Sequence, residues 1–144
     1  MTTARDIMHT GVTCVRAHET ITDAARRMAE QGIGALPICG DDDHLYGMLT
    51  DRDIVTRYIA TGTDPKTATI GEMAQGTVYQ VDADASVQQM LDVMTEHRVR
   101  RLPVIDNHRL VGIVSVADVA RHLPEHAVAG FVKAICAQEA ISSK

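Results

Sequence analysis

Apolar residues recur at spacings of three and four positions along two stretches of the chain. The first stretch holds Ile21, Ala24, Ala25 and Met28, and the second holds Val87, Met90, Leu91 and Met94. This spacing places the apolar side chains on one face of a helix, so each stretch predicts an amphipathic helix. A hydroxyl residue precedes each stretch, Thr20 in the first and Ser86 in the second, and predicts the N-cap.

Short apolar runs flank the two predicted helices and predict β-strands. They span residues 11–15, 36–39 and 45–49 in the first half of the chain and 77–81, 102–105 and 110–114 in the second. Two of these runs begin Leu-Pro, and proline is tolerated where a strand starts. A second helix is predicted after the third strand of each half. Each half therefore has the order β-α-β-β-α, which predicts an α/β (α+β) fold.

The two halves are copies of one another. Gly47 matches Gly112 at an offset of 65 residues, and Pro37 matches Pro103 at an offset of 66. The offset changes within the loop 40–44, where an extra residue is easily accommodated. We therefore expect a first repeat at 4–60, a linker rich in turn formers at 61–69, a second repeat at 70–123, and a C-terminal helix and tail with its own apolar stripe at 124–144.

One motif occurs in both repeats: a glycine, two apolar residues, a hydroxyl residue and, three positions later, an aspartate. It lies in Gly47–Ile54 and in Gly112–Val119. The hydroxyl and the aspartate fit a capping box, which stabilises the start of a helix by about 1 kcal/mol. The same geometry suits a ligand, because helix N-terminal amides bind phosphate and an aspartate accepts hydrogen bonds from ribose hydroxyls. Spacing alone does not separate the two interpretations.

Taken together, these patterns resemble the CBS domain family, named after cystathionine β-synthase, in its tandem form (a Bateman module). The resemblance rests on Arg5-Asp6-Ile7-Met8 and Ile70-Gly71-Glu72-Met73, on the Leu-Pro strands and on the Gly-x-x-(Thr/Ser)-x-x-Asp motifs. It implies two repeats packed with pseudo-twofold symmetry around two clefts that hold adenine nucleotides such as AMP, ADP or ATP. It also implies a regulatory homodimer without catalytic machinery.

By this resemblance, four side chains are the predicted ligand-binding residues. Thr50 and Ser115 would contact phosphate, and Asp53 and Asp118 would contact ribose. Two longer stretches, residues 35–43 and 121–126, are similar to the hypoxic response type of CBS protein in actinobacteria. That similarity implies a role in adaptation to low-oxygen stress.

Composition and charge argue against several other classes of function. The net charge of −5, without a basic stripe, argues against general nucleic-acid binding. The N-terminus lacks the features of a secretory signal and no apolar run approaches about 18 residues, so no membrane span is expected. A cytoplasmic location is the default, with export without a leader left open. The sequence has no phosphate loop, Gly-x-Ser-x-Gly elbow or His-Glu-x-x-His motif, and we expect no enzyme.

Cys14 and Cys39 end the first and second predicted strands of the first repeat. In a β-α-β unit these strands are parallel neighbours with level ends, which brings the two residues within disulfide reach. The alternative is two buried thiols, which a reducing cytoplasm favours. The second repeat has Gln80 and Ile105 at the equivalent positions, so the fold does not require cysteine there. Cys136, in the C-terminal helix, is expected to be free.

His97 and His122 fall near the C-terminal ends of the two helices of the second repeat. A histidine there can simply interact with the helix dipole. The alternative is zinc: the two helices run in opposite directions, so an antiparallel contact in a dimer would pair His97 of one chain with His122 of the other. Water or Glu125 would complete the coordination.

Two functions remain open at this point. One is a non-enzymatic CBS sensor that binds a nucleotide. The other is a ligand-free structural or protein-interaction dimer stabilised by the Cys14–Cys39 disulfide, by zinc, or by both.

Overall fold

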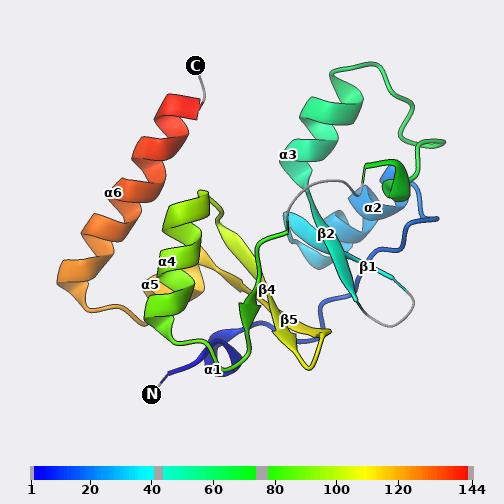
Figure 1. Ribbon diagram of the computed structural model, residues 1–144. Coiled ribbons are helices and arrows are strands. Elements are labelled where there is room, and N and C mark those ends of the chain that lie inside the picture. The colour runs from blue at the N-terminus through cyan, green and yellow to red at the C-terminus, as the bar shows by residue number, and fades with distance from the viewer. Residues whose placement is uncertain (1, 41–43, 74–77, 143–144) are drawn as a thin grey trace. The chain divides into compact units, whose positions relative to one another are not determined.

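The structure is a computed structural model that describes residues 2–40, 44–73 and 78–142, with side chains left out at 72–73 and 137–142. The chain forms two compact units (Figure 1). Unit 1 contains Met1–Gly11 together with Tyr79–Lys144, and unit 2 contains Val12–Val78. Each unit combines helices with a small sheet, which confirms the predicted fold class.

Unit 2 is built on an antiparallel hairpin of two strands. Its elements are α2 (Ile21–Gln31), β1 (Ala35–Cys39), β2 (Leu45–Thr50), α3 (Asp51–Asp53), the π-helical segment η1 (Ile54–Ile59) and the 3-10 helix η2 (Ile70–Met73). Thr20 caps α2 as predicted, because its hydroxyl accepts the N–H of Asp23 at 3.2 Å. The helix ends at Gly32, whose φ of +65° suits glycine and interrupts the helical path.

The predicted strand 11–15 is reduced to one bridge. Val15 pairs with Ile38 in the parallel direction, with its N–H donating to Pro37 at 2.9 Å and its carbonyl accepting from Cys39 at 3.0 Å. The strand prediction was too long because Gly11 adopts a φ of +73°, which turns the backbone out of the extended conformation. The loop residues 41–43 and the start of the other predicted first strand, Thr77, lie outside the described residues.

Unit 1 contains a three-stranded sheet in the order β3-β4-β5, in which β3 is parallel to β4 and β4 is antiparallel to β5. Its elements are α1 (Ala4–Ile7), β3 (Val81–Asp82), α4 (Val87–His97), β4 (Arg101–Asp106), β5 (Arg109–Ser115), α5 (Val116–Ala120) and α6 (Glu125–Ser142). Ser86 caps α4 by accepting the N–H of Gln89 at 3.2 Å, as predicted. The chain's first residues complete this unit, since the N–H groups of Ala4 and Arg5 donate to Ala85 and Ala83.

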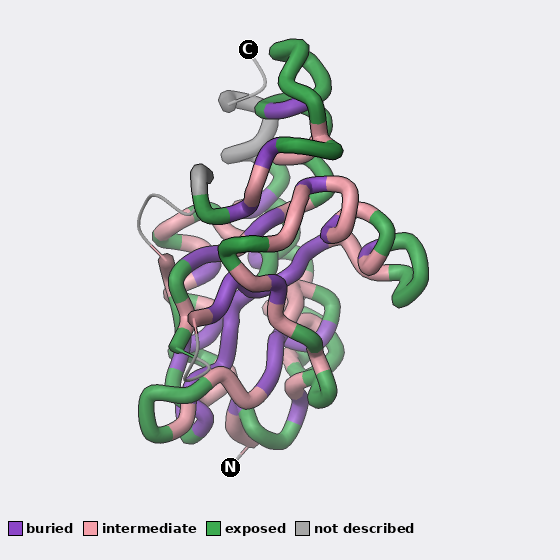
Figure 2. The backbone as a smooth tube through the Cα atoms, turned by 90° about the vertical axis from the view of Figure 1, so that its right-hand side faces the viewer, coloured by how far each residue is buried: buried purple, intermediate pink, exposed green. Residues whose placement is uncertain are grey.

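Each unit buries its own core, which is mostly aliphatic, and Figure 2 colours the buried positions of the chain purple. The core of unit 2 consists of Val15, Ile21, Ala24, Met28, Leu36, Ile38, Leu49, Tyr58, Ala68 and Ile70. The core of unit 1 consists of Ala4, Ile7, Val81, Ala83, Ala85, Met90, Met94, Leu102, Val104, Val114, Val119, Phe131 and Ile135. Both predicted helix stripes therefore face a core.

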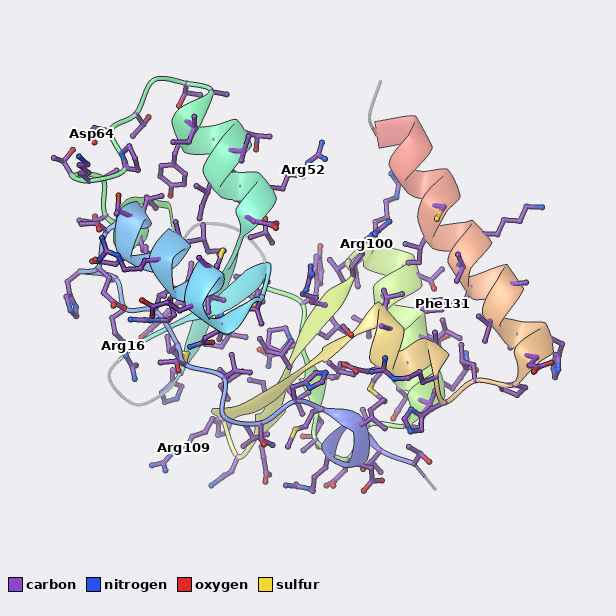
Figure 3. The ribbon with its side chains drawn as sticks, turned by 180° about the vertical axis from the view of Figure 1, so that it is seen from behind. Arg16, Arg52, Asp64, Arg100, Arg109 and Phe131 are labelled. Atoms are coloured by element: carbon purple, nitrogen blue, oxygen red, sulfur yellow. A yellow bond between two sulfur atoms is a disulfide. The ribbon has the colours of Figure 1, made fainter. Side chains whose placement is uncertain are left out.

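The C-terminal helix α6 covers part of unit 1. It packs on α4, and Phe131 extends from it on the side that faces α4 (Figure 3). Phe131 and Ile135 are both buried in the core of unit 1, to which Phe131 adds an aromatic ring. Within the ranges that the structure describes, no helix has the length and hydropathy needed to cross a bilayer.

Candidate functional site

The first hydroxyl–aspartate motif forms a complete capping box at the start of α3. The Thr50 hydroxyl accepts the N–H of Asp53 at 3.0 Å, and Asp53 Oδ2 accepts the N–H of Thr50 at 3.0 Å. The Asp53 side chain is half-buried, and the neighbouring Arg52 is exposed and points away from the helix (Figure 3). The capping interpretation is therefore correct for this motif, and among the described residues no donor contacts Asp53 Oδ1.

The second motif forms the same capping box at the start of α5, but hydrogen bonds from other side chains occupy the oxygens of its aspartate. Asp118 Oδ2 accepts from the N–H and the hydroxyl of Ser115, at 2.8 and 2.9 Å. Oδ1 accepts from His9 Nε2 at 3.0 Å and from the guanidinium of Arg121. The side chain is only 2% exposed. A carboxylate accepts about four hydrogen bonds, and these donors fill that capacity.

The protonation of Asp118 follows from these contacts. Burial raises the pKa of its carboxyl group, but the hydrogen bonds from Ser115 and the interaction with His9 outweigh burial and lower the pKa below its usual value. The carboxylate is thus ionised at neutral pH and acts only as an acceptor. His9 Nε2 is therefore the donor in the contact between them.

A cavity of about 730 Å³ lies in unit 2, and the sequence did not predict it. It is lined by Arg16, Ala17, His18, Ile38, Cys39, Gly40, Tyr46 and Gly71. The guanidinium of Arg16, on the segment before α2 (Figure 3), donates to the carbonyl of Gly40. Basic groups and an aromatic ring in a cavity of this size suit an anionic ligand with a flat ring.

The cavity and the Thr50–Asp53 cap lie at opposite ends of the β1–β2 hairpin. Cys39, at the cavity, pairs with Leu45, whereas Ala35 pairs with Thr50. Four residues of strand separate the two ends, which corresponds to about 13 Å. They are therefore two distinct candidate positions within unit 2.

A disulfide joins Cys14 to Cys39 beside this cavity, with the two Cα atoms 5.6 Å apart. The parallel bridge between Val15 and Ile38 places the two cysteines side by side, as predicted from the sequence. A half-buried side chain also contacts Cys14: Arg27 donates to Glu19 at 2.6 Å and to the carbonyl of Cys14 at 2.9 Å. The Cys136 thiol is free and exposed.

The two histidines singled out by their helix positions both lie in unit 1. The ring of His97 stacks on Tyr79, with centroids 3.8 Å apart and planes 12° from parallel. His122 Nδ1 lies 2.9 Å from the carbonyl oxygen of Asp118. Since a carbonyl only accepts, Nδ1 is the donor in this contact, which leaves Nε2 as the ring nitrogen for a metal. Among the described residues, no three His, Cys, Asp or Glu side chains gather as a metal site.

A family model places the chain among known proteins. The model of the CBS domain matches residues 4–60 and 70–125. The chain belongs to the CBS domain family. Both CBS copies contain the Gly-x-x-(Thr/Ser)-x-x-Asp motif, so the predicted resemblance is confirmed.

Among its CBS relatives, the chain is 67% identical over 143 residues to Hypoxic response protein 1 of Mycobacterium tuberculosis, which covers 99% of this chain and 100% of the relative. A crystal structure of Hypoxic Response Protein I with two coordinated zinc ions superposes with a TM-score of 0.77 at 68% identity, covering 85% of this chain and 100% of that one. CBSX2 in complex with AMP has a TM-score of 0.72 at 23% identity over 85% of this chain and 96% of that one, a likeness of fold.

Proposed function

We propose that this CBS pair is a non-enzymatic regulatory protein that binds an adenine nucleotide. The observation that carries the proposal is the 730 Å³ cavity in unit 2, with the basic side chains Arg16 and His18 and the ring of Tyr46. Nucleotides present a flat base and an anionic phosphate, which match these groups. The Thr50–Asp53 cap is a second candidate position, and a fold neighbour, CBSX2, is known in complex with AMP.

Calorimetric titration with AMP, ADP, ATP and S-adenosylmethionine tests this function and separates the two positions. We expect binding heat and a rise in melting temperature with at least one adenine nucleotide. Arg16→Gln should weaken binding if the cavity holds the nucleotide, and Asp53→Ala should weaken it if the cap does. No heat and no thermal shift with any of the four compounds would exclude the function.

A second candidate function is a dimer linked by zinc, and a specific observation favours it. The carbonyl of Asp118 holds His122 through Nδ1, which leaves Nε2 as the ring nitrogen for a metal, the arrangement usual for a zinc-bound histidine. A relative 68% identical to this chain holds two coordinated zinc ions. We assign His97 of one chain and the partner subunit's His122 to each of two equivalent zinc ions, with water or Glu125 completing the set.

Metal analysis and light scattering test the zinc dimer. The dialysed protein should hold about one zinc per chain and run as a dimer. His97→Ala should lose both the zinc and the dimer, whereas His126→Ala, which removes an exposed histidine on α6, should keep both. Zinc retained by His97→Ala would contradict the assignment.

The relative's name suggests the physiological setting. Because Hypoxic response protein 1 is 67% identical over nearly the whole chain, we assign this protein to the response to low oxygen. Its transcript should rise when the source cells are deprived of oxygen, and a constant transcript would contradict this role.

A further inference from the structure

The two copies of the hydroxyl–aspartate motif differ in the state of their aspartates. Asp118 is almost fully buried, and four donors from Ser115, His9 and Arg121 occupy its oxygens. Asp53 is half-buried and, in the described part of the chain, accepts one hydrogen bond, from Thr50. Among the described contacts, the oxygens of the aspartate are therefore fully occupied in the second motif and only partly occupied in the first.

The group that closes the second motif belongs to the N-terminal segment Thr3–His9. His9 exchanges two main-chain hydrogen bonds with Ile113 on β5, of 2.8 and 3.1 Å, and its imidazole reaches Asp118. The segment is anchored at its other end by the buried Ala4 and by Ile7, only 9% exposed, which pack in the core of unit 1. His9 itself is 66% exposed at its side chain, so it forms the outer, solvent-facing end of the segment.

The N-terminal segment can pack this closely on β5 because the second motif has a glycine, Gly112, without a Cβ atom. A Cβ atom on Gly112 would lie 2.6 Å from Met8 Sδ and 2.8 Å from the carbonyl oxygen of His9. On Gly47, the equivalent glycine, a Cβ would lie 3.4 Å from Ile38 Cδ1 and within 4 Å of no other residue that the structure describes. Among the described residues, the close approach is therefore found at Gly112 and not at Gly47.

The sequence shows the same difference between the repeats. At the offset of 65, the position of His9 is taken by Ala74 and the position of Arg121 by Thr56. Neither alanine nor threonine offers a cationic donor, so the first repeat lacks both side chains that occupy Asp118 Oδ1.

We propose that the segment Thr3–His9 is an internal cover of the Ser115–Asp118 site, and that a ligand's hydroxyl groups reach Asp118 only after His9 leaves. The CBS pair then has one aspartate that is accessible at once, Asp53, and one that opens only when the N-terminal segment detaches. The identity of the ligand rests on the proposed nucleotide-binding function; the cover itself does not.

Carboxylate labelling tests the cover without any ligand. A water-soluble carbodiimide with glycinamide modifies accessible carboxylates, and mass spectrometry of the peptides gives the rate at each aspartate. In the wild-type protein, Asp53 should label and Asp118 should not. His9→Ala should speed labelling of Asp118 by about tenfold, the factor expected for the loss of one hydrogen bond to a charged group.

Two matched variants control this experiment. His9→Gln keeps a side-chain donor and should keep Asp118 largely protected, while His126→Ala removes an exposed histidine elsewhere and should change nothing. Circular dichroism confirms that each variant is folded. Labelling of Asp118 as fast as that of Asp53 in the wild type, or an unchanged rate in folded His9→Ala, would overturn the cover.

AMP titration of further variants distinguishes a failure of the cover from a failure of the proposed nucleotide-binding function. In the background Arg16→Gln/Asp53→Ala, which weakens both candidate positions of unit 2, His9→Ala should create or strengthen AMP binding, and adding Asp118→Ala should remove that gain. If no variant binds AMP while the labelling follows the expectation, the nucleotide function fails and the cover stands. If Asp118→Ala abolishes AMP binding although His9 is intact, and His9→Ala leaves the affinity unchanged, the cover fails and the function stands.

Discussion

Removal of the Cys14–Cys39 disulfide should destabilise unit 2 by a predictable amount. The two cysteines are 25 residues apart in sequence, and the bond closes a loop that contains α2. Closing a loop of that length removes about 12 cal/mol/K from the entropy of the unfolded chain, or about 3.5 kcal/mol at 25 °C. The Val15–Ile38 bridge remains in the reduced protein, so we expect loosening rather than loss of the fold.

Urea denaturation of the oxidised protein, the reduced protein and the double variant Cys14→Ala/Cys39→Ala measures the effect. With a slope of about 1.5–2 kcal/mol per molar urea, the midpoint for unit 2 should fall by about 2 M. Hydrogen exchange should accelerate at amides of unit 2, such as that of Cys39, and stay unchanged in the strands of unit 1. Cys136→Ala removes the exposed free thiol and serves as the control.

A small effect would refute the reasoning. If reduction and the double substitution both lower the free energy of unfolding by less than about 1 kcal/mol, the loop-closure account fails for this bond. A comparable loss in Cys136→Ala would show that the chain responds to the loss of any thiol.

Three further predictions rest on single contacts. Gly112→Ala should lower the free energy of unfolding by about 2 kcal/mol, because its Cβ would break the two main-chain hydrogen bonds between His9 and β5. Gly47→Ala should lower it by less than about 1 kcal/mol, and equal losses for the two variants in urea denaturation would contradict this prediction. The pKa of Asp118 is lower in the folded protein than in the unfolded chain, so the ionised carboxylate stabilises the folded state. This contribution to the free energy of unfolding is complete above about pH 4 and disappears as the pH falls through the folded-state pKa. The difference in stability between the wild type and Asp118→Asn should therefore shrink on acidification. Chelation of zinc should lower the melting temperature of the wild type and leave that of His97→Ala unchanged.

The helices and the hairpins were predictable because their determinants are local. Thr20 and Ser86 cap their helices, Gly32 ends one, and the apolar stripes face the cores. The two short first strands were harder, since one bridge at Val15 and two residues of β3 carry little apolar pattern of their own. Their pairing depends on neighbouring strands, and strand propensity is dominated by such context.

The candidate sites were less predictable because their contacts are long-range. His9 and Asp118 are 109 positions apart, and no periodicity connects them. The stack of Tyr79 on His97 has the same character. Arg121 differs: it lies three residues after Asp118 on a predicted helix, where such pairs meet, so the sequence did contain that signal.

The occupancy of the aspartate oxygens, rather than the presence of the motif, decides what each motif can bind. A ribose at Asp118 would replace a guanidinium and an imidazole with two neutral hydroxyl groups. The guanidinium adds a charge–charge attraction to its hydrogen bond with the carboxylate, which a neutral hydroxyl group cannot supply, so the two hydroxyl contacts return less than the displaced contacts cost. A ribose at Asp53 adds to Oδ1, which accepts no hydrogen bond from the residues that the structure describes, and displaces none of the described contacts. With equal intrinsic contacts, a nucleotide therefore fills the first motif before the second, and the order of filling reverses only if the phosphate or base gains several kcal/mol at the second.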